Sequence, residues 1–384
     1  MTATPPAPPT PLTAAQRAAL RHVRTRATAG HGAALARIEA AVGGAVETAD
    51  LVARIRDHVR VTLNFHPDRF VAGGPTVAES LALDGRYRSQ YETGLSNGSR
   101  TAHPGGARDG WEERLFGGAY HADGGARPGE RPKYGALNLY GHPDGASPRF
   151  GSCHVRLRPE VNARVTYCHG DSHLGPVDVG TIDTFGRVLA GVLAEDADIA
   201  RLPYPAVAVT AAVTAAVTAA EPGRKLDAYV EAQVHGDIDL VTDAEALVVD
   251  PSFRGTDTGR LLAATARRCG IALEWHAGFV LAPDEVDAEF RGAMMVPFAA
   301  WVCRSYARTG ILDAEVLGRA AASVVRDPAA WARWGTRDEV LQYVKQLWHV
   351  LVRFGRTDGR TDGRPGERTG ERTGGVNRRA APER

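Results

Sequence analysis

One short segment, YVEAQVHGDIDL at residues 229–240, holds several chemically capable side chains at a spacing that a β-strand would bring together. Alternate side chains of a strand point to opposite faces. Glu231, Gln233 and His235 would therefore share one face, while the apolar residues between them pack onto a core. β-Branched residues and a closing Gly-Asp pair favour a strand over a helix here. Such a strand could present Glu231 as a catalytic acid, and an antiparallel strand with one solvated face is the structural alternative.

Upstream of this segment, arginines lie near aromatic and hydroxyl residues in glycine-rich surroundings. A guanidinium group matches phosphate oxygens through two parallel hydrogen bonds. Glycine next to Ser or Thr lets a ligand approach the backbone closely. For any single arginine, a surface ion pair is the structural alternative. The candidate residues for contacts to a phosphate-bearing ligand are Arg88, Arg131, Tyr134, Ser152, Thr166 and Ser172.

The pattern His-x-Asp suggests a different chemistry, because imidazole and carboxylate groups are ligands for zinc and other transition metals. It occurs five times, and one copy extends to H-G-D-S-H at residues 169–173. A metal-dependent hydrolase is therefore a second hypothesis. Histidine and aspartate in glycine-rich loops are also ordinary turn residues, and no H-E-x-x-H motif is present. We therefore assign no metal ligand.

The composition predicts an ordinary globular protein without targeting to membranes or nucleic acid. The 384 residues are 43% hydrophobic and 24% charged, with a formal net charge of +1. Such a balance gives no bulk attraction to nucleic acid or to an anionic membrane. We expect a cytoplasmic protein, because four widely spaced cysteines form no C-x-x-C pair and no secretory signal or long apolar run is present. Walker A and G-x-G-x-x-G motifs are also absent, which argues against P-loop ATPases and dinucleotide-binding oxidoreductases.

Hydrophobic periodicity divides the chain into five parts. A central β-rich region is expected to be the catalytic domain, because long glycine-rich loops in a compact domain are often functional. Helical regions flank it on both sides, so the predicted fold class is α+β. The predicted boundaries are a disordered segment at 1–12, helices at 13–61, the β-rich domain at 62–284, helices at 285–354 and a disordered tail at 355–384.

Several segments together resemble a bacterial family of unknown function, domain-of-unknown-function family 3626. The resemblance covers roughly residues 50–300 and implies no activity. The segments that carry it are NFHPDR (64–69), QYETGLSNG (90–98), RPKYGALNL (131–139), RFGSCHVRL (149–157), YVEAQVHG (229–236), DPSFRGT (250–256) and EWHAGF (274–279).

The order of an arginine strand, a Ser/Thr strand and a glutamate strand also resembles the mono-ADP-ribosyltransferases and their toxin relatives. This resemblance implies a split pair of antiparallel sheets holding NAD in a cleft, with NAD and an unknown acceptor as partners. Glu231 would then stabilise the oxocarbenium-like transition state as nicotinamide leaves. Arg88 or Arg131 would contact the NAD phosphates, and Thr166, Ser172 or Ser152 would support the nicotinamide half.

The glutamate motif departs from this second resemblance. An E-x-E or Q-x-E sequence is expected, and here residues 231–233 are E-x-Q, with Gln233 in the second place. The departure argues against arginine-directed transfer, which is similar to the two-glutamate version, and leaves NAD glycohydrolysis or another acceptor open. A non-catalytic binding or immunity-type module is the third hypothesis, in which the polar strand face is a recognition surface.

Overall fold

The computed structural model describes residues 11–42, 48–71, 74–95, 102–196 and 225–356 of the chain. The predicted disordered segments at residues 1–12 and 355–384 lie almost entirely outside the described residues.

Eight strands form one continuous sheet in the order β10-β9-β4-β1-β3-β7-β5-β6. All neighbouring pairs are antiparallel except β9 and β10, which are parallel. Strands β2 (Arg86–Tyr87) and β8 (Ile238–Asp239) form a separate antiparallel pair. The eight strands are β1 (Val61–Phe65), β3 (Lys133–Leu137), β4 (Cys153–Leu157), β5 (Val165–His169), β6 (Val179–Thr181), β7 (Val230–Val234), β9 (Ala244–Val249) and β10 (Ala272–Trp275).

The predicted central β-rich region between two helical ends is confirmed by this arrangement. Within the described residues, however, the large sheet is continuous and mixed, whereas a split pair of antiparallel sheets was expected. The parallel pair arises because a helix, α10 (Asp257–Cys269), connects β9 to β10. A helical crossover returns the chain to the starting edge of the sheet, so the second strand runs in the same direction as the first.

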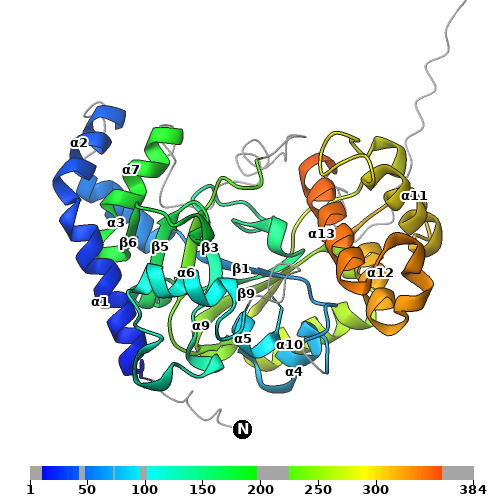
Figure 1. The fold of residues 1–384 in the computed structure, drawn as a ribbon, viewed down its shortest axis with the longest axis horizontal. Helices are drawn as coiled ribbons and strands as arrows, with labels where there is room; N and C mark the ends of the chain where they lie inside the picture. Colours follow the sequence, from blue (N-terminus) through cyan, green and yellow to red (C-terminus); the bar gives the residue numbers. More distant parts are fainter. Residues whose placement is uncertain (1–10, 43–47, 72–73, 96–101, 197–224, 357–384) are drawn as a thin grey trace, which may run out of the picture.

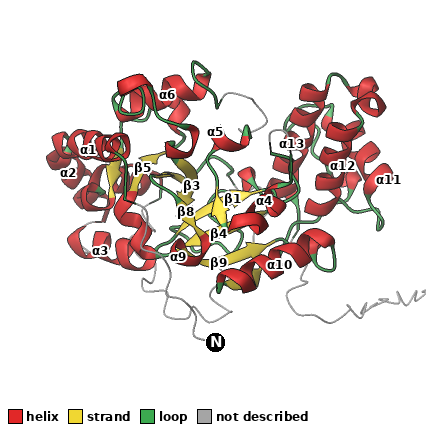
Figure 2. Ribbon diagram, turned by 90° about the horizontal axis from the view of Figure 1, so that it is seen from below, coloured by secondary structure: helices red, strands yellow, loops and turns green. Residues whose placement is uncertain are grey.

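Helices cover both ends of the sheet (Figure 1). Three of them, α11, α12 and α13, pack against one another at one end, and α4 packs against α10 close to β9 (Figure 2). Among the described residues, no helix is long and apolar enough to cross a membrane. Besides α10, the helices are α1 (Ala14–Ala29), α2 (His31–Val42), α3 (Thr48–His58), α4 (Val77–Asp84), α5 (Gln90–Thr93), α6 (Ala107–Phe116), α7 (Gly186–Glu195), α9 (Leu240–Asp243), α11 (Met295–Tyr306), α12 (Ala314–Arg326) and α13 (Arg337–Phe354).

One hydrophobic core joins the two helical ends to the sheet. It contains Ile38 and Ile55 from the N-terminal helices, Val155 and Ala232 from the sheet, and Leu347 from α13. Burial of apolar side chains is the main favourable contribution to folding. The N-terminal helices, the sheet and the C-terminal helices are therefore held together by shared apolar packing.

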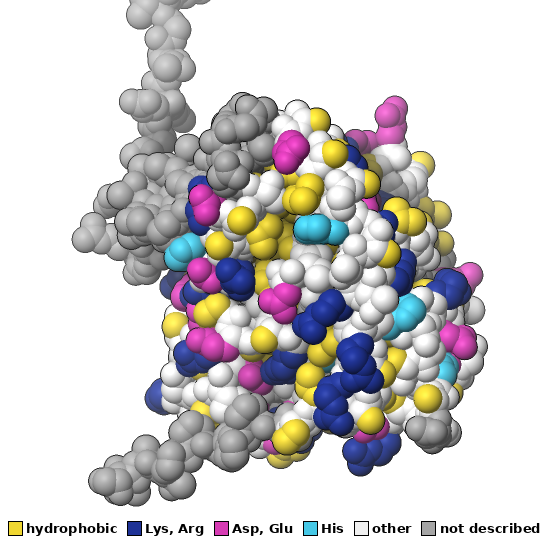
Figure 3. Space-filling model, turned by 90° about the vertical axis from the view of Figure 1, so that its left-hand side faces the viewer, with side chains coloured by type: hydrophobic (Ala, Val, Ile, Leu, Met, Phe, Trp, Pro, Cys, Tyr) yellow, Lys and Arg dark blue, Asp and Glu magenta, His cyan; other side chains and the backbone are white. Residues whose placement is uncertain are grey.

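Helix α1 has four arginines and no acidic residue, and it packs on the edge strand β6. Basic side chains gather on this side of the molecule (Figure 3). Arg24 pairs with Asp183 at 3.2 Å, and Arg26 donates to the carbonyl of Leu115. These two contacts tie α1 to neighbouring parts of the chain.

Strand β7 alternates as predicted, but neither of its faces is solvated. Val230, Ala232 and Val234 belong to the main core. Glu231 and Gln233 share the opposite face and are only 6% and 0% exposed. On that face Gln233 contacts Cys168 of β5, and the ring of His235 contacts Phe116 of α6, both members of a second, smaller apolar cluster. A buried polar row needs hydrogen-bond partners, which the candidate site supplies.

Candidate functional site

A cleft of about 1320 Å³ lies between the sheet and the C-terminal helices. Its walls come from the end of β1, from α4, β2, β3 and β7, and from α12 and α13 across the opening. Three of the predicted site residues line it: Arg88, Tyr134 and Glu231. The cleft also contains the aromatic rings of Phe65, Phe70, Tyr87 and Phe150 and the basic side chains of Arg69, Arg86, Arg108, Arg149, Arg337 and Lys345.

Glu231 is held at the cleft by two neutral donors. The backbone N–H of Ser172 donates to its Oε2 at 3.1 Å, and the side-chain Nε2 of Gln233 donates to its Oε1 at 2.8 Å. Burial raises the pKa of Glu231 to about 7, and the nearby charge of Asp171 acts in the same direction. The hydrogen bonds from Ser172 and Gln233 oppose the rise but do not cancel it. The carboxyl group can therefore change its charge near neutral pH.

Gln233 and Thr166 lie behind Glu231 and do not line the cleft. They face each other in the register of β5 and β7, and the Thr166 hydroxyl donates to Gln233 Oε1 at 2.7 Å. That bond fixes the amide so that its NH₂ group points to Glu231. The two residues therefore set the position of the carboxylate from inside the sheet.

Ser172 and Asp171 belong to the H-G-D-S-H loop. Ser172 donates its backbone N–H to Glu231, and both its backbone and its side chain lower the pKa of that carboxyl group. Asp171 lines the cleft and accepts hydrogen bonds from Tyr229 Oη at 2.9 Å and from His173 N at 3.1 Å, while His173 Nδ1 lies 2.7 Å from it. Although burial opposes this, the contacts with His173 and Tyr229 lower the pKa of Asp171. Asp171 is therefore a charged neighbour of Glu231.

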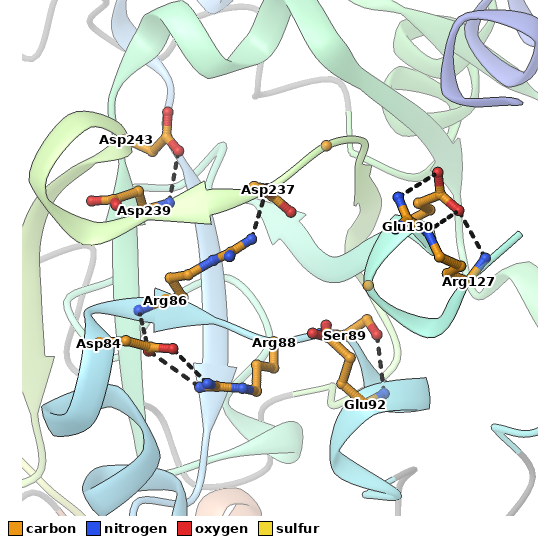
Figure 4. Close-up of polar contacts among 12 residues, drawn as sticks. Asp84, Arg86, Arg88, Ser89, Glu92, Arg127, Glu130, Asp237, Asp239 and Asp243 are labelled. Atoms are coloured by element: carbon orange, nitrogen blue, oxygen red, sulfur yellow. Dashed lines mark hydrogen bonds and ion pairs between the residues drawn. The ribbon is translucent and has the colours of Figure 1, made fainter. Parts of the chain in front are cut away.

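The two predicted phosphate-contacting arginines lie in different surroundings. Arg131 is 4% exposed, does not line the cleft, and pairs with Asp109 at 2.8 Å and Glu112 at 2.9 Å. Arg88 lines the cleft with 26% of its side chain exposed. Its guanidinium bonds Asp84 at 2.6 Å and the Ser80 hydroxyl at 2.7 Å, and Figure 4 shows the Asp84 pair beside β2. Only Arg88 of the two can reach a ligand without breaking a buried ion pair.

Tyr134 connects the cleft to the buried pairs of Arg131. Its hydroxyl donates to Glu112 Oε1 at 2.8 Å, and Glu112 also accepts from Arg131. The guanidinium carbon of Arg108 lies 4.3 Å from the centre of the tyrosine ring, within the range of a cation–π contact. Tyr134 thus lines the cleft while its hydroxyl group is held by Glu112 inside the protein.

The sequence profile of a family described as proteins of unknown function matches residues 60–354. The chain belongs to the DUF3626 family. No curated protein matches the chain significantly. All the residues that line the cleft lie inside the matched range, whereas α1, α2 and α3 precede it. The DUF3626 match therefore covers the complete candidate site but assigns no activity to it.

The two remaining candidate residues, Ser152 and His235, are buried in this DUF3626 protein and do not line the cleft. Ser152 is buried before β4, and its carbonyl is bonded to His276 Nε2 at 2.8 Å. His235 is buried between Tyr120 Oη at 2.5 Å and Thr166 Oγ1 at 3.1 Å. Burial lowers the pKa of His235 to about 3, so it is neutral at physiological pH. Within the parts of the chain that the structure describes, no three His, Cys, Asp or Glu side chains gather as a metal site would require.

Sequence reasoning missed five basic residues of the cleft, which are Arg69, Arg108, Arg149, Arg337 and Lys345. Arg149 stands at the start of a segment that carries the family resemblance, and Lys345 is one of only three lysines, so both had a weak signal. GLSNG at residues 94–98 also fits the G-x-S-x-G pattern of serine hydrolases. It follows helix α5, whereas a nucleophile elbow follows a strand, and Ser96 lies outside the described residues.

Proposed function

We propose that this protein binds NAD in its cleft and cleaves the nicotinamide–ribose bond, with Glu231 as the catalytic carboxylate. The observation that carries the proposal is Glu231 itself, a buried carboxyl group fixed by two donors in a large cleft. Ionisable groups with perturbed pKa values in a cleft are candidate functional residues. The order of arginine, hydroxyl and glutamate elements along the chain agrees with the resemblance to ADP-ribosyltransferases.

The lining of the cleft supports a dinucleotide as the ligand. Aromatic rings such as Tyr87 and Phe150 offer surfaces for a base, and Arg88 offers a guanidinium for a phosphate oxygen. The volume is above the usual range for small-molecule sites, about 300–1000 Å³, which leaves room for an acceptor beside NAD.

The proposed step requires a carboxylate close to a cationic centre. When the glycosidic bond breaks, its electron pair goes to the nicotinamide nitrogen, which becomes neutral, and positive charge develops on the ribose. Water or another acceptor then bonds to the ribose carbon and releases a proton. An ionised Glu231 would stabilise that positive charge, because a fixed anion beside a developing cation lowers the barrier.

The E-x-Q sequence fits this role. Gln233 donates to Glu231 and accepts from Thr166, so it positions the carboxylate without adding a second negative charge. A glutamate in that place could not donate a hydrogen bond when ionised. Gln233 and Thr166 are therefore positioning residues in this proposal, and Ser172 is a backbone donor.

The test is nicotinamide release from NAD by the purified protein, compared with the variant Glu231→Gln. Glu195→Gln is the matched control, because Glu195 is an exposed glutamate on α7 with no place in the cleft. We expect Glu231→Gln to lower the release at least a hundredfold, an effect of about 3 kcal/mol on the barrier. The control should release nicotinamide like the wild type.

The pH dependence gives a second readout. Because the carboxylate form is required, release should rise with pH through about 7 and level off above it, and the Glu231→Gln variant should lack this rise. NAD binding with no nicotinamide release, with water or any acceptor tried, would favour the non-catalytic binding module. Equal release by wild type and Glu231→Gln would overturn the catalytic assignment.

A further inference from the structure

Four basic side chains lie near one another around α13 and the turn at Pro148–Phe150: Arg149, Arg291, Lys345 and Arg353, called here the basic cluster. Arg149 and Lys345 line the cleft. The guanidinium carbons of Arg291 and Arg353 each lie 4.8 Å from the ring centre of Phe290. The shared ring brings these two cations close together, although like charges repel.

The charges of the basic cluster are only partly neutralised by the protein. Arg149 pairs with Asp227, whose side chain is 75% exposed, so solvent screens part of this attraction. Neither Arg291 nor Arg353 pairs with a carboxylate among the described residues. Burial lowers the pKa of Lys345 to about 8, and the positive charges of Arg149 and Arg291 act in the same direction.

Two geometric features also indicate a ligand site. Among the described residues, Arg291 is the only non-glycine residue with a left-handed backbone, at φ 65°. Residues held in such a conformation cluster at ligand-binding and active sites. In addition, the buried Nε atoms of Arg149 and Arg353 have no hydrogen-bond partner among the described residues. Buried N–H donors normally have a partner, and the Nε of the ion-paired Arg131 also lacks one, so this feature supports a site only together with the proximity of the four cations.

We propose that the basic cluster binds a ligand that carries two or more phosphoryl groups. Phosphoryl oxygens match guanidinium groups in geometry and charge, and a multiply charged anion would remove the repulsion between the four cations. Because Arg149 and Lys345 line the same cleft as Glu231, such a ligand can extend toward the carboxylate. The proposal does not depend on cleavage of NAD.

The experiment is isothermal titration of inorganic pyrophosphate into the full-length protein at low salt. Arg291→Asn and Lys345→Gln each remove one charge, and asparagine tolerates the left-handed backbone at position 291. Arg333→Gln is the matched control, because its guanidinium also lies 4.8 Å from the centre of an aromatic ring, that of Trp334, but is not among the charges that act on Lys345. We expect saturable binding to the wild type, at least tenfold weaker binding to the first two variants, and unchanged binding to the control.

A second arm compares ADP with pyrophosphate. Tighter binding of ADP would identify a nucleotide as the source of the phosphoryl groups, and equal binding would identify a polyphosphate or another diphosphate. Absence of saturable binding would overturn the proposal, as would an equal loss in Arg333→Gln and Arg291→Asn. Glu231→Gln should bind pyrophosphate like the wild type, so loss of cleavage with retained binding would separate this site from the proposed function.

Discussion

Two buried charged groups near neighbouring strands, Arg131 before β3 and Glu231 on β7, are stabilised in opposite ways. Arg131 lies between two carboxylates, Asp109 and Glu112, and Glu112 is itself fully buried. Glu231 has neutral donors and a like-charged neighbour, Asp171. The first arrangement satisfies its charges and joins α6 to the sheet, while the second leaves a carboxyl group whose ionisation is costly. The difference agrees with a structural role for Arg131 and with the proposed catalytic role for Glu231.

The same comparison can be made between Arg131 and the arginines of the basic cluster. Arg131 is compensated by carboxylates inside the protein, whereas Arg291 lies beside the cations Arg149 and Arg353. Several cations close together beside the cleft, with a charge-compensated arginine behind it, are what a binding site on a rigid support requires.

The largest expected effect comes from replacing Arg131. In the variant Arg131→Met, the buried Glu112 would lose its cationic partner. We expect a loss of about 3–5 kcal/mol in the free energy of unfolding, because an unpaired buried charge is left behind. Urea denaturation measures this loss. Arg88→Met is the control and should lose less than about 1 kcal/mol, because Arg88 is partly exposed. Similar losses in both variants would contradict the difference between the two arginines.

A charge added beside Glu231 should also destabilise the fold. In Gln233→Glu, two carboxyl groups would lie where an amide now donates to Glu231 at 2.8 Å. We expect a loss of about 2–4 kcal/mol at pH 8, because two adjacent buried carboxylates repel each other and lose a donor. The loss should shrink toward pH 5, where the pair holds protons. Gln233→Met removes the donor to Glu231 without adding a charge, so its loss should also be larger at pH 8 than at pH 5, but smaller than that of Gln233→Glu.

Removal of the charge at Glu231 should have the opposite sign. A carboxyl group whose pKa is raised in the folded state stabilises the protein below its ordinary pKa near 4.5, and this contribution is lost as pH rises to about 7. Glu231→Gln should therefore be more stable than the wild type at pH 8, by about 2 kcal/mol after weaker hydrogen bonds are allowed for. At pH 4 the advantage should be absent. Parallel pH profiles of the melting temperature would show that Glu231 carries no such cost.

Local sequence patterns predicted strand β7 correctly and could not predict its surroundings. Alternation placed Glu231 and Gln233 on one face and the valines on the other, and the structure agrees. The alternative of one solvated face is wrong, because this face is buried and α6, which precedes β7 by more than a hundred residues, contacts it through Phe116 and His235. Alternation in the sequence predicts which residues share a face of the strand. Which elements pack on that face depends on residues far away in the sequence.

The two arginines show the same limit. Arg88 and Arg131 had equal standing in the sequence, because each stands among aromatic and glycine residues. Arg131 is buried in ion pairs with Asp109 and Glu112 on α6, and no local sequence motif predicts those contacts. Arg149 and Lys345, nearly two hundred residues apart, likewise meet at the cleft only through the packing of α13.

The sequence by itself determined the periodicities: helices at both ends, β-rich structure between them, the alternation around Glu231 and the resemblance to the DUF3626 family. These depend on local spacing and on residue types, which a linear chain contains in full. The tertiary structure alone decided that Glu231 is buried at a cleft with its pKa near 7, that Arg131 belongs to the scaffold, and that four basic side chains converge. Burial and charge compensation are properties of contacts between distant residues, so only the folded chain defines them.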